Sequence, residues 1–351
     1  MSDTRDADRR ETPDGKTVAD VDLDADGSRS DAGVHDERRG TTGETATEKT
    51  FEPLPAAGIF LLYALTILGG VALVGPYRAA GVRAFEDPSA LSNVALIVAE
   101  VLAATLLLLL AFRYDRAEGV VRLAVLGAVA VLVQSPVGVL LPASVPAPGL
   151  VGPAVGAAVA GVLWVYPEWY VTDVAAVGFG AAAVGLFGVS LSPLPVVALL
   201  VVMAVYDAYS VYVSEHMQSL GGGVVDLKLP MVFVVPVDRE FSLLAVDDLA
   251  DLSGGAMLLG VGDAVFPGML AASALAFLDA PAVVAGLSLP VLGALAGAAV
   301  GFVALEALLF AVRRTHAGLP ALNGGVLAGY LAGSLAAGVP LVEALGLAPY
   351  L

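Results

Sequence analysis

The sequence predicts an all-α, polytopic membrane protein with nine transmembrane helices, an N-terminus in the cytoplasm and an extracellular C-terminus. Of its 351 residues, 58% are hydrophobic and only 15% are charged, whereas soluble domains carry roughly 25% charged residues. Apolar runs of about 20 residues, enough to cross a bilayer, recur along most of the chain. The predicted helices cover residues 56–75, 91–112, 120–141, 149–166, 172–190, 193–214, 256–278, 284–311 and 319–338.

Residues 1–53 precede the first apolar run and are predicted to form a disordered, acidic cytoplasmic tail. Residues 1–50 hold 14 acidic and 8 basic residues, and such a segment buries too little apolar surface to offset its ordering entropy. Because the tail is polar throughout, it does not read as a cleavable signal peptide. Its preference for Asp and Arg resembles that of proteins from salt-loving archaea; an acidic segment that binds a partner is the alternative.

The orientation follows from the Arg and Lys residues of the loops. A cytoplasmic N-terminus places 15 basic residues inside and leaves only Arg78 and Arg83 outside. The predicted organisation is then helices one to six in 54–214, a cytoplasmic loop in 215–255, helices seven to nine in 256–340, and a short C-terminal tail in 341–351.

Two smaller patterns concern packing. The run Met231–Val237 is rich in β-branched residues and predicts either a strand or a segment on the membrane surface. Glycines recur at a spacing of four in helices eight and nine, which predicts close approach of the two backbones. These glycines are Gly293, Gly297, Gly301, Gly325, Gly329 and Gly333.

Several kinds of chemistry are excluded by composition. Cysteine is absent, which removes disulfides, thiol nucleophiles and thiolate metal sites. The three histidines are scattered and form no HExxH motif, so a zinc metalloprotease is not expected. The sequence predicts no metal, no cofactor and no nucleic-acid partner.

Asp207 and Asp263 interrupt apolar helices, where an ionisable group is costly and usually functional. Each lies about 7 residues from the cytoplasmic end of its predicted helix, which is roughly 10 Å below the membrane surface. Two carboxyls that share one proton can activate a water and protonate a leaving group, because close like charges cannot both ionise. Which acid is the base stays open. The alternatives are an ion-coupled transporter that uses the same acids and a non-catalytic membrane chaperone.

The surroundings of Asp263 also favour chemistry. Gly260 and Gly262 flank Val261, and each glycine inside a helix costs about 1 kcal/mol relative to alanine. They therefore suggest close backbone approach or local unwinding, which would admit water and an extended substrate. Pro320 opens the ninth predicted helix at the same depth, where proline is ordinarily a helix-start signal.

Three short motifs, in this order, resemble those of the presenilin and signal peptide peptidase family of intramembrane aspartyl proteases, and an archaeal presenilin-like homologue in particular. They are Tyr206-Asp207 (YD), Gly260-Val261-Gly262-Asp263 (GxGD) and Pro320-Ala321-Leu322 (PAL). The resemblance implies that Asp207 and Asp263 are the catalytic pair. It also implies that the remaining motif residues shape the site or position substrate, namely Tyr206, Gly260, Gly262, Pro320, Ala321 and Leu322.

The resemblance implies an endopeptidase of the cell membrane that cuts within transmembrane segments of other membrane proteins. Its partners would be those segments and the lipid bilayer, and homo-oligomers are left open. Because cleavage requires an unwound substrate, Met231–Val237 or the backbone just before Gly260 could pair with it by strand addition. Two further intramembrane acids, Glu100 and Glu306, belong to no motif and are expected to be structural.

Overall fold

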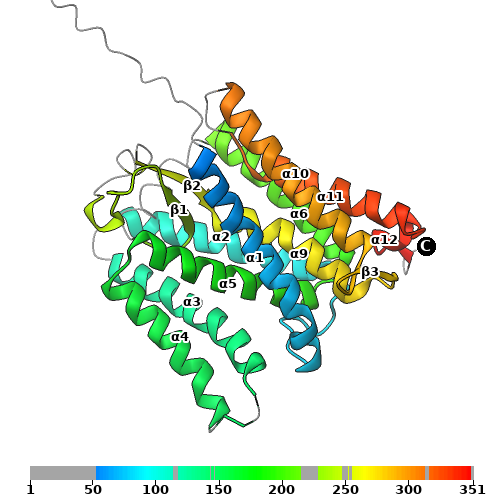
Figure 1. Cartoon of the computed structure of the whole chain (residues 1–351), viewed down its shortest axis with the longest axis horizontal. Coiled ribbons are helices and arrows are strands. Elements are labelled where there is room, and N and C mark those ends of the chain that lie inside the picture. Colours follow the sequence, from blue (N-terminus) through cyan, green and yellow to red (C-terminus); the bar gives the residue numbers. More distant parts are fainter. Residues whose placement is uncertain are drawn as a thin grey trace, which may run out of the picture. The chain divides into compact units, whose positions relative to one another are not determined.

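A computed structural model of the chain describes residues 53–113, 118–142, 144–145, 147–214, 228–246, 252, 255–312 and 316–348, which form a helical bundle with two small β-hairpins (Figure 1). Parts of the predicted tails and of the predicted cytoplasmic loop lie outside these residues, at positions 1–52, 215–227, 247–251, 253–254 and 349–351.

The main helices lie on the nine predicted segments. They are α1 (Pro53–Ala79), α2 (Ser92–Arg113), α3 (Glu118–Leu140), α4 (Pro148–Val165), α5 (Trp169–Ser190), α6 (Pro193–Tyr209), α9 (Val261–Phe277), α10 (Leu289–Val312) and α11 (Leu319–Ala336). A π-helical turn, η1 (Ser210–Ser214), extends α6; a 3-10 turn, η2 (Leu243–Ala245), lies before β2, and a short helix, α12 (Leu341–Ala344), follows α11.

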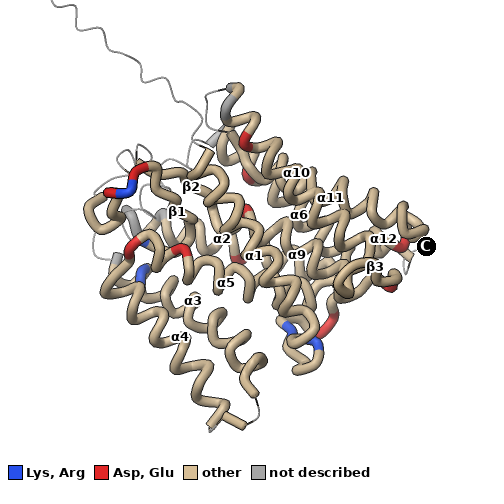
Figure 2. Tube along the Cα trace, viewed as in Figure 1, with Lys and Arg blue, Asp and Glu red and all other residues tan. Residues whose placement is uncertain are grey.

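Within the described part of the chain, seven helices are long and apolar enough to cross a membrane, while α2 and α9 hold the shorter apolar stretches Ser92–Leu108 and Val261–Phe277. Apolar side chains also face outward: Leu61, Leu65 and Leu68 on α1 are 46–57% exposed. An apolar exterior of this extent suits lipid rather than water. The charged residues lie mostly near helix ends (Figure 2), so the chain is a multi-pass membrane protein.

The expectation of an all-α protein was wrong at two hairpins. Strands β1 (Val232–Pro236) and β2 (Ala256–Gly260) pair antiparallel, with Val234 opposite Leu258. The predicted strand in Met231–Val237 is therefore confirmed, but the helix predicted to start at 256 starts at Val261. The apolar segment Ala256–Gly260 is compatible with a helix or a strand, and it forms a strand here because it pairs with β1.

The eighth helix likewise begins later than predicted, at Leu289 rather than 284. The strands β3 (Ala282–Val284) and β4 (Leu287–Ser288) come first and form a second hairpin. Its turn residues, Ala285 and Gly286, have φ values of +49° and +80°. Positive φ at both central positions is the geometry that two-residue hairpins favour, because its twist matches that of the strands.

Helix α9 lies at the centre of the bundle, in contact with α1, α5, α6, α10 and α11. Its middle is built from small residues that are fully buried, such as Ala272 and Ser273. An added Cβ at Gly188 of α5 would overlap Ala272, so small side chains let these two helices approach closely. The segment that begins with Asp263 is thereby held by five neighbours.

Helices α10 and α11 run side by side (Figure 1) and confirm the predicted glycine contact. A Cβ added at Gly293 or Gly297 would overlap the backbone carbonyl of Gly329 or Gly325. The same is true in the reverse direction. Close backbone contact of this kind stabilises helix pairs in lipid, where the hydrophobic effect does not drive association.

Candidate active site

Asp207 lies in the last turn of α6, directly before the π-helical turn η1. Its Oδ2 accepts a hydrogen bond of 3.0 Å from the backbone N–H of Leu319, 112 residues later in the chain. The N–H of Gly318 also faces this carboxyl. These are N–H groups at the start of α11, which have no partner inside their own helix, so Asp207 satisfies donors that the helix start leaves free.

Asp263 is the third residue of α9, whereas the sequence predicted that it lies about 7 residues after the start of a longer helix. Gly260, in extended conformation, is the N-cap residue, and its N–H donates to the Asp263 carboxyl. An acid at this position commonly folds back onto the N-cap N–H and stabilises the helix start. A Cβ added at Gly260 would lie 3.1 Å from Oδ2 of Asp263. Glycine at 260 therefore leaves room for the carboxyl.

The three motifs meet at Gly318 and Leu319. A Cβ added at Gly318 would lie 3.8 Å from Oδ1 of Asp263, and the next residue donates its N–H to Asp207. The charges of the two acids interact. The start of α11 thus lies beside both carboxyls: the Leu319 N–H binds Asp207, and the Gly318 backbone lies near Asp263, immediately before the PAL residues.

The other predicted site residues are more dispersed. Tyr206 is half-buried and packs against the main core. Leu322 is fully buried, and Ala321 presents its carbonyl to Gly301 of α10, whereas Pro320 is exposed. These contacts fix the start of α11 in place. Two of the predicted site residues, Gly262 and Pro320, are exposed.

Two buried acids at the start of α5 were not predicted from the sequence: Glu168, its N-cap residue, and Asp173, which are 6% and 4% exposed. Asp173 Oδ1 accepts the N–H of Val234 in β1 at 2.9 Å. Glu168 accepts bonds from Ser242 and from the N–H of Leu243, the latter at 3.1 Å. Asp173 could have been found from the sequence, because it is an acid inside an apolar run. Its partner, the N–H of Val234, carries no such local signal.

Asn323, the residue after the PAL motif, is also buried. Its Nδ2 donates to the carbonyl of Leu200 in α6 at 2.9 Å, while its Oδ1 has no partner among the described residues. The amide bond ties α11 to α6, the helix that carries Asp207.

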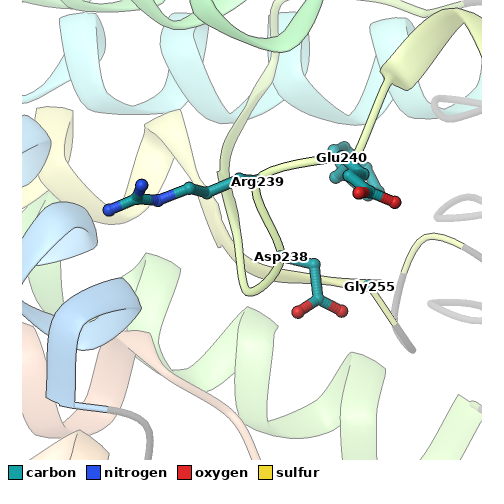
Figure 3. A pocket seen from close by; sticks show the side chains of 5 residues that line it. Asp238, Arg239, Glu240 and Gly255 are labelled. Carbon is teal, nitrogen blue, oxygen red and sulfur yellow. The ribbon is translucent and has the colours of Figure 1, made fainter.

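Two cavities are lined by neither Asp207 nor Asp263. One, of about 570 Å³, is lined by Asp238, Arg239, Glu240, Phe241 and Gly255 at the far end of the first hairpin from Gly260. Its labelled charged side chains diverge, with Arg239 pointing away from Asp238 and Glu240 (Figure 3). The other, of about 540 Å³, is apolar and lies between α3, α4 and α5. Neither contains a predicted site residue.

Fold and site together define a multi-pass membrane protein with two interacting acids on neighbouring helices of an apolar bundle. The profile of the family described as signal-peptide peptidase, presenilin aspartyl protease matches residues 57–339. The chain belongs to this family, and it is accordingly a peptide hydrolase of the intramembrane aspartate protease class.

Solved structures support the same family. Two structures of a presenilin family intramembrane aspartate protease, from C222 and P2 crystals, are 31% and 32% identical to this chain, with TM-scores of 0.57 and 0.58. Each match covers 81% of this chain, and 100% and 99% of the solved chain. A comparison with curated proteins gave no match. The family disfavours the transporter alternative.

Proposed function

We propose that Asp207 and Asp263 hydrolyse peptide bonds within transmembrane segments of other membrane proteins, as an acid–base pair. The observation that supports this most is the convergence of both carboxyls on Gly318 and Leu319. Each acid has a backbone donor that fixes its orientation, and neither is neutralised by a basic side chain within the described residues. Both are therefore available for proton transfer.

In the proposed reaction, one carboxylate takes a proton from a water molecule, which attacks the scissile carbonyl carbon. The other, protonated, acid donates its proton to the carbonyl oxygen. Collapse of the tetrahedral intermediate then breaks the C–N bond, and the amine leaves with a proton from the pair. Two acids that share one proton can perform all of these transfers, and either assignment of the roles satisfies this scheme.

We propose that the substrate pairs with the outer edge of β2. The bonds from Val261 N–H to the Met231 carbonyl, 2.9 Å, and from Val237 N–H to the Gly255 carbonyl, 3.0 Å, fix the register. This register turns the backbone groups of Ala256 and Leu258 away from β1. An added strand would lie along that edge, which leads directly to Gly260 and Asp263. Of the two edges suggested by the sequence, β2 is the better candidate.

For the topology, we propose nine spans with the N-terminus in the cytoplasm and the C-terminus outside, so that α2 and α9 also cross the bilayer. The apolar stretches of α2 and α9, Ser92–Leu108 and Val261–Phe277, are at the lower limit of length for crossing. Arg122, Lys228 and Arg239 then lie on the cytoplasmic side, opposite Arg78 and Arg83. The tail, loop and helix groups keep the predicted limits, except for the strands that precede α9 and α10. Gly262 and Pro320, which are exposed, would face the substrate.

The test is mass spectrometry of a single-span peptide incubated in detergent with wild-type protein or with Asp263→Ala. New peptide termini that appear only with the wild type support the proposal. Equal cleavage by the two proteins would refute the acid pair. Proton or cation flux in liposomes without any new termini would instead support transport.

A further inference from the structure

We propose that Asp173 and Glu168 of α5 are positioning residues that hold the β1–β2 hairpin against the bundle and thereby set which substrate bond reaches Asp207 and Asp263. The inference rests on the proposed strand addition to β2. It assigns a function to two acids outside the three family motifs.

The bond from Asp173 closes one edge of the hairpin. In this antiparallel register, β1 is bonded to β2 through its odd-numbered residues, so the N–H of Val234 points to the opposite side. There the Oδ1 atom of Asp173 accepts it at 2.9 Å, and both residues are 4% exposed. Helix α5 therefore occupies the outer edge of β1. A substrate strand is left with the outer edge of β2.

Glu168 fixes the segment that follows β1. As the N-cap residue of α5, it accepts the N–H of Trp169, and the same carboxyl binds the Ser242 hydroxyl and the Leu243 N–H. Its contacts thus join the start of α5 to the 3-10 turn η2. The two acids hold the hairpin at two points, one on β1 and one beyond its end.

The position of β2 then follows from that of β1. Ladder bonds reach from Met231–Val261 to Val237–Gly255, and β2 continues without a break into α9, where Asp263 is the third residue. On the other side, a Cβ at Gly58 of α1 would lie 2.8 Å from Val235 Cγ1. A hairpin wedged between α1 and α5 presents one fixed register to the acids. Loss of the α5 contact should let it slide or tilt.

The experiment compares Asp173→Ala with Asp173→Asn, whose amide oxygen can still accept the Val234 N–H. We expect Asp173→Ala to cut the peptide at several neighbouring bonds instead of the wild-type bonds, and to raise hydrogen exchange in residues 231–237 by roughly tenfold. Asp173→Asn should retain the wild-type product pattern. The control is Ser190→Ala, which removes the 2.7 Å bond from the Ala84 N–H at the opposite end of α5.

A tether provides the rescue. The Cβ position of Gly58 lies 3.7 Å from Val235 Cβ, within the range for a disulfide, and the chain has no cysteine of its own. In the Gly58→Cys, Val235→Cys background, oxidation should restore the product pattern of Asp173→Ala and its slow exchange. Reduction should abolish both effects.

Either of two results would overturn the inference: an unchanged pattern and unchanged exchange in Asp173→Ala, or the same altered pattern in Ser190→Ala. Hydrogen exchange needs no substrate. If the wild type cleaved nothing, the proposed function would fail, while the anchoring of β1 by α5 would still be decided by the exchange of residues 231–237.

Discussion

The acids of the candidate active site and the acids that anchor the first hairpin lie in the same bundle but have opposite surroundings. Asp207 and Asp263 interact with each other and share the start of α11. Asp173 and Glu168 face backbone N–H groups and a hydroxyl. In the proposed mechanism the first pair acts on water and substrate, whereas the second pair binds chain segments that lie outside the helices.

This difference shows that burial alone does not identify a functional acid in a membrane protein. Glu168 and Asp173 are more buried than Asp207, yet their chemistry is that of a cap and an edge anchor. What separates the two classes is the kind of group that lies near the carboxyl. Asp173 and Glu168 bind backbone and hydroxyl donors of the first hairpin and its loop, whereas Asp207 and Asp263 lie near one another, and an acid near a second acid can exchange a proton.

The largest effect is expected from the acid pair itself. Asp207→Asn should lower cleavage by about 10³-fold or more, because a general acid–base group typically contributes 10²–10⁴-fold. Asp173→Asn should change the rate by less than about threefold, since its acceptor atom is preserved. Initial rates with one peptide at several concentrations give both values. Comparable losses in the two variants would remove the distinction drawn between the pairs.

The next largest effect is expected at Gly260, whose missing side chain leaves room for the Asp263 carboxyl. Gly260→Ala places a Cβ 3.1 Å from Oδ2, and the carboxyl must shift by a few tenths of an ångström. We expect a rate loss of about 10- to 100-fold, because small displacements of a catalytic group are costly. Gly127→Ala in α3, where no atom lies within 4 Å of the new Cβ, is the control and should keep the wild-type rate. A fully active Gly260→Ala would show that the tight approach has no catalytic role.

A smaller effect, on stability, is expected at Glu168. Burial raises the pKa of this carboxyl, but its hydrogen bonds from Ser242, Leu243 and Trp169 outweigh burial and hold the pKa below its ordinary value of 4.5. The stabilisation is therefore fully present above pH 4.5 and is lost as the pH falls through the lower, folded-state pKa.

Glu168→Gln should accordingly destabilise the protein by about 1–2 kcal/mol at neutral pH, and the difference from the wild type should shrink below pH 4.5. Thermal unfolding in detergent at both pH values measures this. A difference that is larger in acid than at neutral pH would contradict the assigned sign.

The smallest effect is expected from the acids outside both pairs. Glu100 of α2 is exposed on the helix surface, and Glu306 of α10 is half-buried; neither belongs to a motif. Glu100→Gln and Glu306→Gln should each leave cleavage within about twofold of the wild type. A loss of 100-fold in either variant would extend the active site beyond α6, α9 and α11.

Much of this arrangement could be predicted from the sequence, because long apolar runs and glycine spacing are local patterns. They locate α1 to α6, α9 to α11 and the contact between Gly297 and Gly325. The start of α9 could not be predicted, since Ala256–Gly260 is as apolar as the transmembrane helices. It forms a strand only because it pairs with β1. The hydrogen bonds from Gly318 and Leu319 to Asp207 could not be predicted either. They act through backbone N–H groups, which every residue except proline possesses.

The bond between Leu319 and Asp207 has a consequence for synthesis of the protein. The two residues are 112 positions apart, so α11 leaves the ribosome well after α6 and α9. A nascent chain that already contains α6 and α9 holds both acids but not the donor that orients Asp207. In the proposed mechanism the acid pair is therefore complete only once α11 has been inserted, so the protease would become active late in its own synthesis.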